Sequence, residues 1–123
     1  EKVESMIEPI EIASILHLLG RSYGKVEDYE EAIKTHLKAL QIYRSALEPV
    51  SLKCAHSLRN LGECQYALQK YHDASESYME ALYIYQQSNG NKHLSVARTN
   101  ELIGTTLLKL GEFDKAILVL EEC

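Results

Sequence analysis

The sequence predicts an all-α fold built from three copies of a two-helix unit, and three observations support this. Several residue types recur at intervals of 42 positions along the 123-residue chain. Each interval contains two stretches with the apolar spacing of an amphipathic helix. The chain has only two Pro and six Gly, which is too few for a turn-rich β protein.

The repeat is defined by columns of matching residues in one register. These columns are Gly20, Gly62 and Gly104; Ala13, Ala55 and Ala97; Ala32, Ala74 and Ala116; and Tyr29, Tyr71 and Phe113. They predict a single domain over residues 1–123, with repeats at about 9–50, 51–92 and 93–123, the last one truncated.

The first helix of unit one is expected over residues 12–23, because its apolar residues follow one helical face. That face consists of Ile12, Leu16, Leu19 and Tyr23. Pro9 and Pro49 are expected to precede the first helices of units one and two, where Pro is tolerated. The stretch SNGNK at 88–92 is the corresponding break before unit three.

The second helix of unit one is expected over residues 29–43, after the turn GKVED at 24–28. Asp28 followed by Glu31 resembles a capping box, which predicts the start of this helix. The turns YALQK at 66–70 and LKLGE at 108–112 open the second helices of the later units. Five tyrosines fall on the packing face of these helices and are expected in the core: Tyr29, Tyr43, Tyr71, Tyr78 and Tyr85.

Gly62 lies in the middle of a predicted helix, where Gly costs roughly 0.5–1 kcal/mol relative to Ala. Its recurrence at one phase of the repeat predicts a packing role. We expect Gly62 and Ala74 to lie where two helices meet, so that the small side chains allow close approach of the backbones.

These residues resemble the tetratricopeptide repeat, whose helix pair carries Leu-Gly and Tyr on the first helix and Tyr, Ala and Ala on the second. Unit one supplies Leu16, Leu19, Gly20, Tyr23, Tyr29, Ala32 and Ala39. The resemblance implies a right-handed superhelical α-solenoid of antiparallel helix pairs. It also implies a concave groove, lined by the first helices, in which family members hold peptide segments of other proteins.

The 42-residue period is longer than the usual 34 and is similar to the kinesin-light-chain type of repeat. Residues 93–116, HLSVARTNELIGTTLLKLGEFDKA, look most like that subgroup. Its loop usually carries His-Pro, whereas here Leu94 follows His93. The resemblance to kinesin-light-chain repeats implies an adaptor that links a partner to a larger machine.

The candidate partner-binding residues lie on the face of each first helix opposite its core stripe. They are Ser14, His17, Arg21 and Lys25 in unit one; His56, Arg59, Asn60, Glu63 and Tyr66 in unit two; and Arg98, Glu101, Leu102, Thr105 and Lys109 in unit three. Leu18, Gly24, Ala67 and Leu108 complete this face.

This face carries five Lys or Arg and two Glu, a net charge of +3, whereas the whole chain carries −5. A basic stripe on an acidic protein favours an acidic peptide and speeds its encounter. Kinesin-light-chain repeats hold peptides in which an aromatic residue is flanked by acidic ones, which fits this balance. The alternative is a solvated helix face whose cations merely avoid the acidic second helices.

Three other functions remain open. Some tetratricopeptide domains clamp the C-terminal carboxylates of chaperones; at those positions only Asn60 matches and Arg98 is a substitute, while His17, Arg21 and Leu102 do not match. A second alternative is a regulatory or substrate-docking module excised from a larger enzyme. A third is a structural spacer or self-association unit.

Catalysis, metals and cofactors are not expected. The three Cys fall in packing columns, and the five His form no H-E-x-x-H motif or close Cys/His cluster. The net charge of −5 argues against broad binding to nucleic acid or anionic membranes. Sparse, unpaired cysteines favour a reducing, cytoplasmic location.

Repeat arrays need polar caps. Residues 1–8 are expected to form a partial cap through Val3, Met6 and Ile7. The end at Cys123 looks uncapped, which predicts either a longer native array or end-to-end packing between copies.

Overall fold

A computed structural model describes the backbone of residues 2–90 and 93–122, and the side chains of that part from residue 8 onward. The described residues form six helices and no strand. These are α1 (Lys2–Lys25), α2 (Tyr29–Ala46), α3 (Leu52–Ala67), α4 (Tyr71–Asn89), α5 (Leu94–Lys109) and α6 (Phe113–Glu121). The expected contributions of Val3, Met6, Ile7 and Cys123 lie outside the described side chains.

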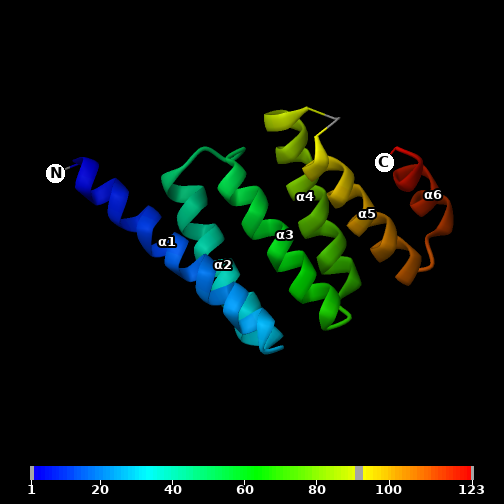
Figure 1. Ribbon diagram of the computed structural model, residues 1–123, viewed down its shortest axis with the longest axis horizontal. Coiled ribbons are helices and arrows are strands. Elements are labelled where there is room, and N and C mark those ends of the chain that lie inside the picture. The colour runs from blue at the N-terminus through cyan, green and yellow to red at the C-terminus, as the bar shows by residue number, and fades with distance from the viewer. Residues whose placement is uncertain (1, 91–92, 123) are drawn as a thin grey trace.

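Each helix packs against the next one along the chain, and α1 also touches α3 (Figure 1). The helices form antiparallel pairs, α1 with α2, α3 with α4 and α5 with α6, that follow one another in a row. The predicted all-α helix-pair solenoid is therefore confirmed. None of the described helices is both long enough and apolar enough to cross a lipid bilayer.

Each helix pair is joined by the same turn. The backbone N–H groups of Asp28, Lys70 and Glu112 donate to carbonyls five residues earlier, at 2.9, 2.8 and 3.0 Å. The residue before each donor has a positive φ: 64° at Glu27, 63° at Gln69 and 77° at Gly111. The left-handed conformation of this residue allows the next backbone N–H to donate to a carbonyl that the helix leaves free.

Side-chain caps fix the starts of several helices. Asp28 Oδ1 accepts from the backbone N–H of Glu31 at 3.4 Å, which is half of the predicted capping box. Ser51 caps α3 by accepting from Lys53 N–H at 3.2 Å. His93 Nδ1 does the same for α5, accepting from Ser95 N–H at 3.1 Å. Local sequence thus determines where these helices begin.

The recurrent glycines are covered by large side chains of the paired helix. A Cβ added to Gly62 would approach the ring of Tyr78 to 2.7 Å, and one on Gly20 would approach the His36 ring to 2.7 Å. Gly104 lies in the same way against Leu120. The covering residue is always 16 positions later. Ala74 is fully buried in the apolar cluster that contains Tyr78.

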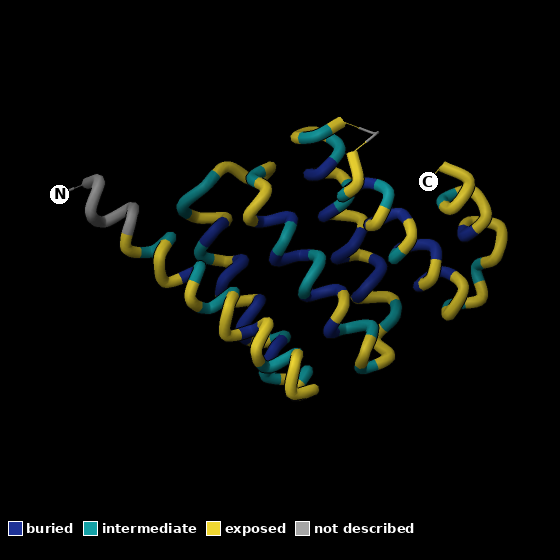
Figure 2. The backbone as a smooth tube through the Cα atoms, viewed as in Figure 1, coloured by how far each residue is buried: buried dark blue, intermediate teal, exposed yellow. Residues whose placement is uncertain are grey.

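The core lies between successive helices, and the buried residues in Figure 2 follow the inner sides of the row. Tyr43, Tyr78 and Tyr85 are buried there, as predicted. Tyr29 and Tyr71 are only partly buried, because each stands at the first residue of its helix, next to the turn. Of the five predicted tyrosines, those in the core are therefore the three that lie beyond the first turns of α2 and α4.

Two residues of the expected core stripe in α1 are exposed, which corrects that prediction. Ile12 is 47% exposed and Leu19 is 42% exposed. Leu61 and Ile103, which share the column of Leu19, are buried. The difference has a simple cause: among the described helices, α3 and α5 each have a helix before them, and α1 has none.

Pro9 lies inside α1 and not before it, because the helix runs from Lys2 to Lys25. The sequence therefore misplaced the start of this helix. A proline inside a helix removes one N–H donor, and the carbonyl that it frees needs another partner such as water. Figure 1 shows the first turns of α1 extending past α2. Pro49 lies in the turn before α3, as expected.

Candidate functional site

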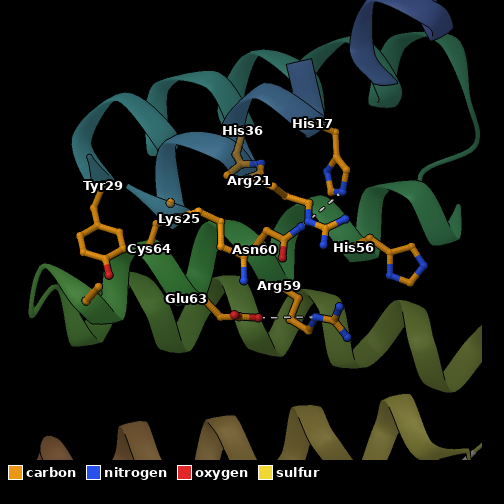
Figure 3. A pocket seen from close by; sticks show the side chains of 13 residues that line it. His17, Arg21, Lys25, Tyr29, His36, His56, Arg59, Asn60, Glu63 and Cys64 are labelled. Carbon is orange, nitrogen blue, oxygen red and sulfur yellow. Dashed lines mark hydrogen bonds and ion pairs between the residues drawn. The ribbon is translucent and has the colours of Figure 1, made fainter. Parts of the chain in front are cut away.

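A pocket of about 640 Å³ lies between α1 and α3, with α2 behind it (Figure 3). We refer to it as the α1–α3 pocket. It is lined by His17, Gly20, Arg21, Gly24 and Lys25 of α1; Tyr29 and His36 of α2; and His56, Arg59, Asn60, Glu63, Cys64 and Ala67 of α3. Its size is typical of sites that hold a small ligand or a few residues of a peptide.

Seven of the fourteen candidate residues line this pocket: His17, Arg21, Lys25, His56, Arg59, Asn60 and Glu63. They come from the predicted faces of the first helices of units one and two, which the fold places next to each other. The remaining seven do not line it: Ser14, Tyr66, Arg98, Glu101, Leu102, Thr105 and Lys109.

Ser14, Tyr66 and Leu102 make packing or structural contacts. The hydroxyl of Ser14 lies 3.1 Å from Tyr43 Oη, within hydrogen-bond distance. Tyr66 packs edge to face against Tyr71, with ring centroids 5.2 Å apart. Tyr66 and Leu102 are partly buried against the apolar cluster that includes Tyr78. Only part of each of these side chains is therefore open to a partner.

The other candidates belong to α5 and are exposed to solvent: Arg98, Glu101, Thr105 and Lys109. The hydroxyl of Thr105 donates to the carbonyl of Glu101 at 2.9 Å, one turn earlier in the helix. These residues continue the polar surface along the row of first helices, but the pocket itself ends at α3.

His17 links the two walls of the pocket. Its Nε2 lies 3.4 Å from Asn60 Nδ2 of α3, and its Nδ1 is buried without a hydrogen-bond partner. Its ring stands edge to face with that of His36, at a centroid distance of 5.6 Å. Burial lowers the pKa of His17, and the nearby charge of Arg21 lowers it further, so the ring is neutral near pH 7.

His36 forms the back of the pocket and was missed as a functional candidate. It lies seven residues after Tyr29 and seven before Tyr43, which puts it on the packing face of α2, and only 1% of its surface is exposed. Its Nδ1 has no hydrogen-bond partner. Burial, followed by the charges of His17 and Arg21, lowers the pKa of His36 to about 4.

The signal that identifies His36 is a column mismatch. At the same register, units two and three carry Tyr78 and Leu120 over their glycines. A polar imidazole stands where the other units place a larger or an apolar side chain. Gly20, Tyr29 and Cys64 also line the pocket and were assigned only to packing.

Arg59 and Glu63 form an ion pair on α3. Arg59 Nε lies 3.7 Å from Glu63 Oε1, which is an ion-pair distance but too long for a hydrogen bond. Burial raises the pKa of Glu63, while the charges of Arg59, Arg21 and Lys25 act to lower it. The carboxylate of Glu63 therefore senses cations from both walls.

His56 is oriented by the helix behind it. Its Nδ1 lies 2.7 Å from Tyr85 Oη of α4, and the two rings are 5.5 Å apart. Burial lowers the pKa of His56, and the charges of Arg59 and Lys53 add to this effect. The imidazole is therefore held as a neutral hydrogen-bonding group at one end of the pocket.

The pocket has a net positive charge at neutral pH. Arg21, Lys25 and Arg59 contribute three positive charges and Glu63 one negative charge, which sums to +2. The three histidines have lowered pKa values and add none. The side chains of Arg21 and Lys25 form no ion pair or hydrogen bond with any residue that the structure describes.

The described part of the chain also contains cysteines and possible metal ligands. No three His, Cys, Asp or Glu side chains there are close enough to hold a metal ion together. Cys54 and Cys64 are free and buried. Burial raises the pKa of Cys54, and it raises that of Cys64 to about 11, so both stay protonated thiols near pH 7.

Comparison with known proteins gives the same fold. The family model described as tetratricopeptide repeat matches residues 11–87 and 60–123. BtubC (BKLC) from P. vanneervenii, a kinesin-light-chain-like protein, has a TM-score of 0.88 at 25% identity, over 93% of this chain and 45% of that chain. This chain thus spans less than half the length of BtubC. No curated protein sequence matches it.

Two more distant structures show the fold alone. The TPR domain of Arabidopsis FLU has a TM-score of 0.73 at 18% identity, over 98% of this chain and 92% of that chain. A point mutant of MamA has a TM-score of 0.69 at 17% identity, over 89% of this chain and 69% of that one.

Proposed function

This chain belongs to the tetratricopeptide repeat family, and we propose that it binds an acidic peptide segment of a partner protein in the α1–α3 pocket. Family membership and the fold neighbours support a protein–protein interaction scaffold. Proteins with these repeats are typically non-catalytic scaffolds. The likeness to BtubC (BKLC) supports the finer proposal of a kinesin-light-chain-like adaptor.

One observation carries the acidic preference: a net charge of +2 is gathered in the pocket of a chain whose net charge is −5. Complementary charge speeds the encounter with an acidic segment and disfavours basic ones. Arg21 and Arg59 line opposite walls of the pocket. Guanidinium groups pair with carboxylates through two parallel hydrogen bonds, which supports the proposal. Arg98 and Lys109 extend the proposed surface along α5.

The test is a titration of fluorescein-labelled peptides that differ only in charge. An Asp/Glu-rich peptide with a central aromatic residue is compared with its Asn/Gln counterpart at low salt. We expect saturable binding of the acidic peptide, weakened at least tenfold by the pair Arg21→Gln and Arg59→Gln. The matched control is the pair Lys34→Gln and Lys38→Gln, which removes the same charge from α2 outside the pocket. Equal loss in both pairs would contradict a role for the pocket.

A second candidate is a regulatory or substrate-docking module of a larger enzyme. The match to the TPR domain of Arabidopsis FLU, over nearly all of both chains, favours a unit that works as one domain of a longer protein. In that case the bound segment belongs to the substrate of the attached enzyme. The full-length coding sequence, and activity of that enzyme with and without the docking segment, distinguish this candidate from a stand-alone adaptor.

The proposal also includes self-association and a cytoplasmic location. Phe113, Ile117 and Leu118 of α6 are each more than half exposed, which supports contact with a second copy. The free thiols of Cys54 and Cys64 support a reducing compartment. Fractionation of the tagged protein in its own cells tests the location.

A further inference from the structure

The α1–α3 pocket contains more unused hydrogen-bond donors than a carboxylate requires. Arg21 and Lys25 have no ion-pair partner among the described residues. Arg59 Nε is buried and forms no hydrogen bond. Because an unpaired buried donor destabilises the folded state, its presence needs an explanation.

His17 adds one more donor. The amide nitrogen of Asn60 can only donate, so at 3.4 Å it makes His17 Nε2 the acceptor. The proton of the neutral ring then lies on Nδ1, which is buried and without a partner. Behind it, His36 is almost fully buried and forms no side-chain hydrogen bond within the described part of the chain. Two imidazoles thus line the pocket with unused polar atoms.

We propose that the α1–α3 pocket binds a phosphate monoester dianion, presented by a phosphorylated serine or threonine in the partner segment. This rests on the proposed peptide-binding function and names the group that the pocket selects. The net charge of +2 balances a phosphoryl group of about −1.5 to −2, whereas one carboxylate leaves positive charge unmatched. A phosphoryl group offers three acceptor oxygens to the cations of the two pocket walls, whereas a carboxylate offers two.

The geometry also assigns a role to Glu63. In the free protein its carboxylate pairs with Arg59 at 3.7 Å, and it feels the charges of Arg21 and Lys25. An incoming phosphate competes with Glu63 for these cations and is repelled by it. Glu63 therefore holds Arg59 in place before binding and weakens the bound state. Neutralising Glu63 should improve phosphate binding, the opposite of what loss of a ligand-binding residue would do.

Small probes test the site without knowledge of the partner. Phenyl phosphate and phenyl sulfate have the same shape, but at about pH 7.5 the phosphate carries nearly two charges and the sulfate one. We expect the phosphate to bind at least tenfold tighter and to shift the imidazole ¹⁵N signals of His17 and His36 in NMR titrations. Equal affinity for the two probes, or shifts confined to other residues, would overturn the proposal.

Three variants assign the effect to the pocket. Arg21→Gln should reduce phosphate affinity at least tenfold. Lys38→Gln, which removes one exposed positive charge from α2 outside the pocket, should leave it within twofold. Glu63→Gln should tighten binding by about two- to fivefold, the range expected for one partly exposed charge pair. If Lys38→Gln weakens binding as much as Arg21→Gln, only the overall charge matters and the proposed site is wrong.

The source of the phosphate is tested with degenerate peptide pools. One pool has a fixed central phosphoserine, one has serine, and free O-phosphoserine is the third arm. Tightest binding of the phosphoserine pool supports the proposal. If the serine pool binds equally well, the phosphate assignment fails while the peptide scaffold stands. If free phosphoserine binds as tightly as the phosphoserine pool, or no pool binds at all, the peptide segment itself is unsupported.

Discussion

The imidazole of His36 lies directly on Gly20: a Cβ added to that glycine would come within 2.7–2.9 Å of three ring atoms. The same contact recurs between Gly62 and Tyr78 and between Gly104 and Leu120. The glycine column therefore makes room for one large side chain per helix pair. In units one and two that side chain is a ring, which cannot bend away as an alkyl chain can.

Gly62→Ala should destabilise the protein by up to about 2 kcal/mol. Crowding against the Tyr78 ring costs about 1–3 kcal/mol, and the better helix propensity of Ala returns about 1 kcal/mol. Gly104→Ala should cost less, because Leu120 is flexible and 37% exposed. Gly24→Ala is the matched control: nothing lies within 4 Å of its added Cβ, so it should stabilise α1 by about 0.5–1 kcal/mol. Urea unfolding followed by circular dichroism measures all three.

The sequence predicts the fold well because the residues that pack the helices recur in each repeat unit. Gly20, Gly62 and Gly104 could be recognised together, whereas a single helical Gly would be ambiguous. The exposure of individual side chains is predicted less well. Helical periodicity identifies the apolar face that contains Leu19, but it cannot say whether another helix covers that face. In this structure no described helix does, and Leu19 is exposed.

The candidate site was predicted only in part, because helical periodicity identifies the face of a helix but not the contacts between helices. Helix faces place Arg21 and Asn60 on one side of the row, and the structure brings both into one pocket. His36 belongs to the packing face of α2, and only the gap between α1 and α3 turns it into a pocket residue. Arg98 lies on the predicted face of α5 but outside the pocket. The face on which a residue lies does not determine the spacing between neighbouring helices.

Acid should destabilise the protein through His36. The pKa of His36 is lowered from 6.5 to about 4, so between these values the unfolded chain binds a proton that the folded chain does not. Stability therefore falls as pH drops from about 6.5 to about 4, by up to about 3 kcal/mol for this group. The variant His36→Phe should lose much of this slope. Thermal unfolding of both proteins across this range measures the difference, and parallel curves would contradict it.

Gln69→Gly should stabilise the turn between α3 and α4. Gln69 has φ 63°, a left-handed conformation that costs a side-chain-bearing residue about 1 kcal/mol. The greater freedom of Gly in the unfolded chain offsets part of this gain, so we expect about 0.5 kcal/mol. The equivalent Gly111 has φ 77°, and Gly111→Ala should destabilise by about 1 kcal/mol. Chemical denaturation should give changes in the free energy of unfolding that have opposite signs for the two variants. Changes of the same sign would show that φ does not determine the stability of these turns.

Self-association should join α6 of one copy to α1 of the next. Ile15 is exposed on α1 although its column partner Ser57 is buried, and Ile117 is exposed on α6 although Ser75 is buried. These are the faces that neighbouring helices cover within the row. Such a head-to-tail contact does not close, so open chains that lengthen with concentration are expected in light scattering. Ile15→Lys and Ile117→Lys should each give monomers, and their mixture should stop at dimers, because each variant keeps one usable face. Dimers of either variant alone would contradict this arrangement.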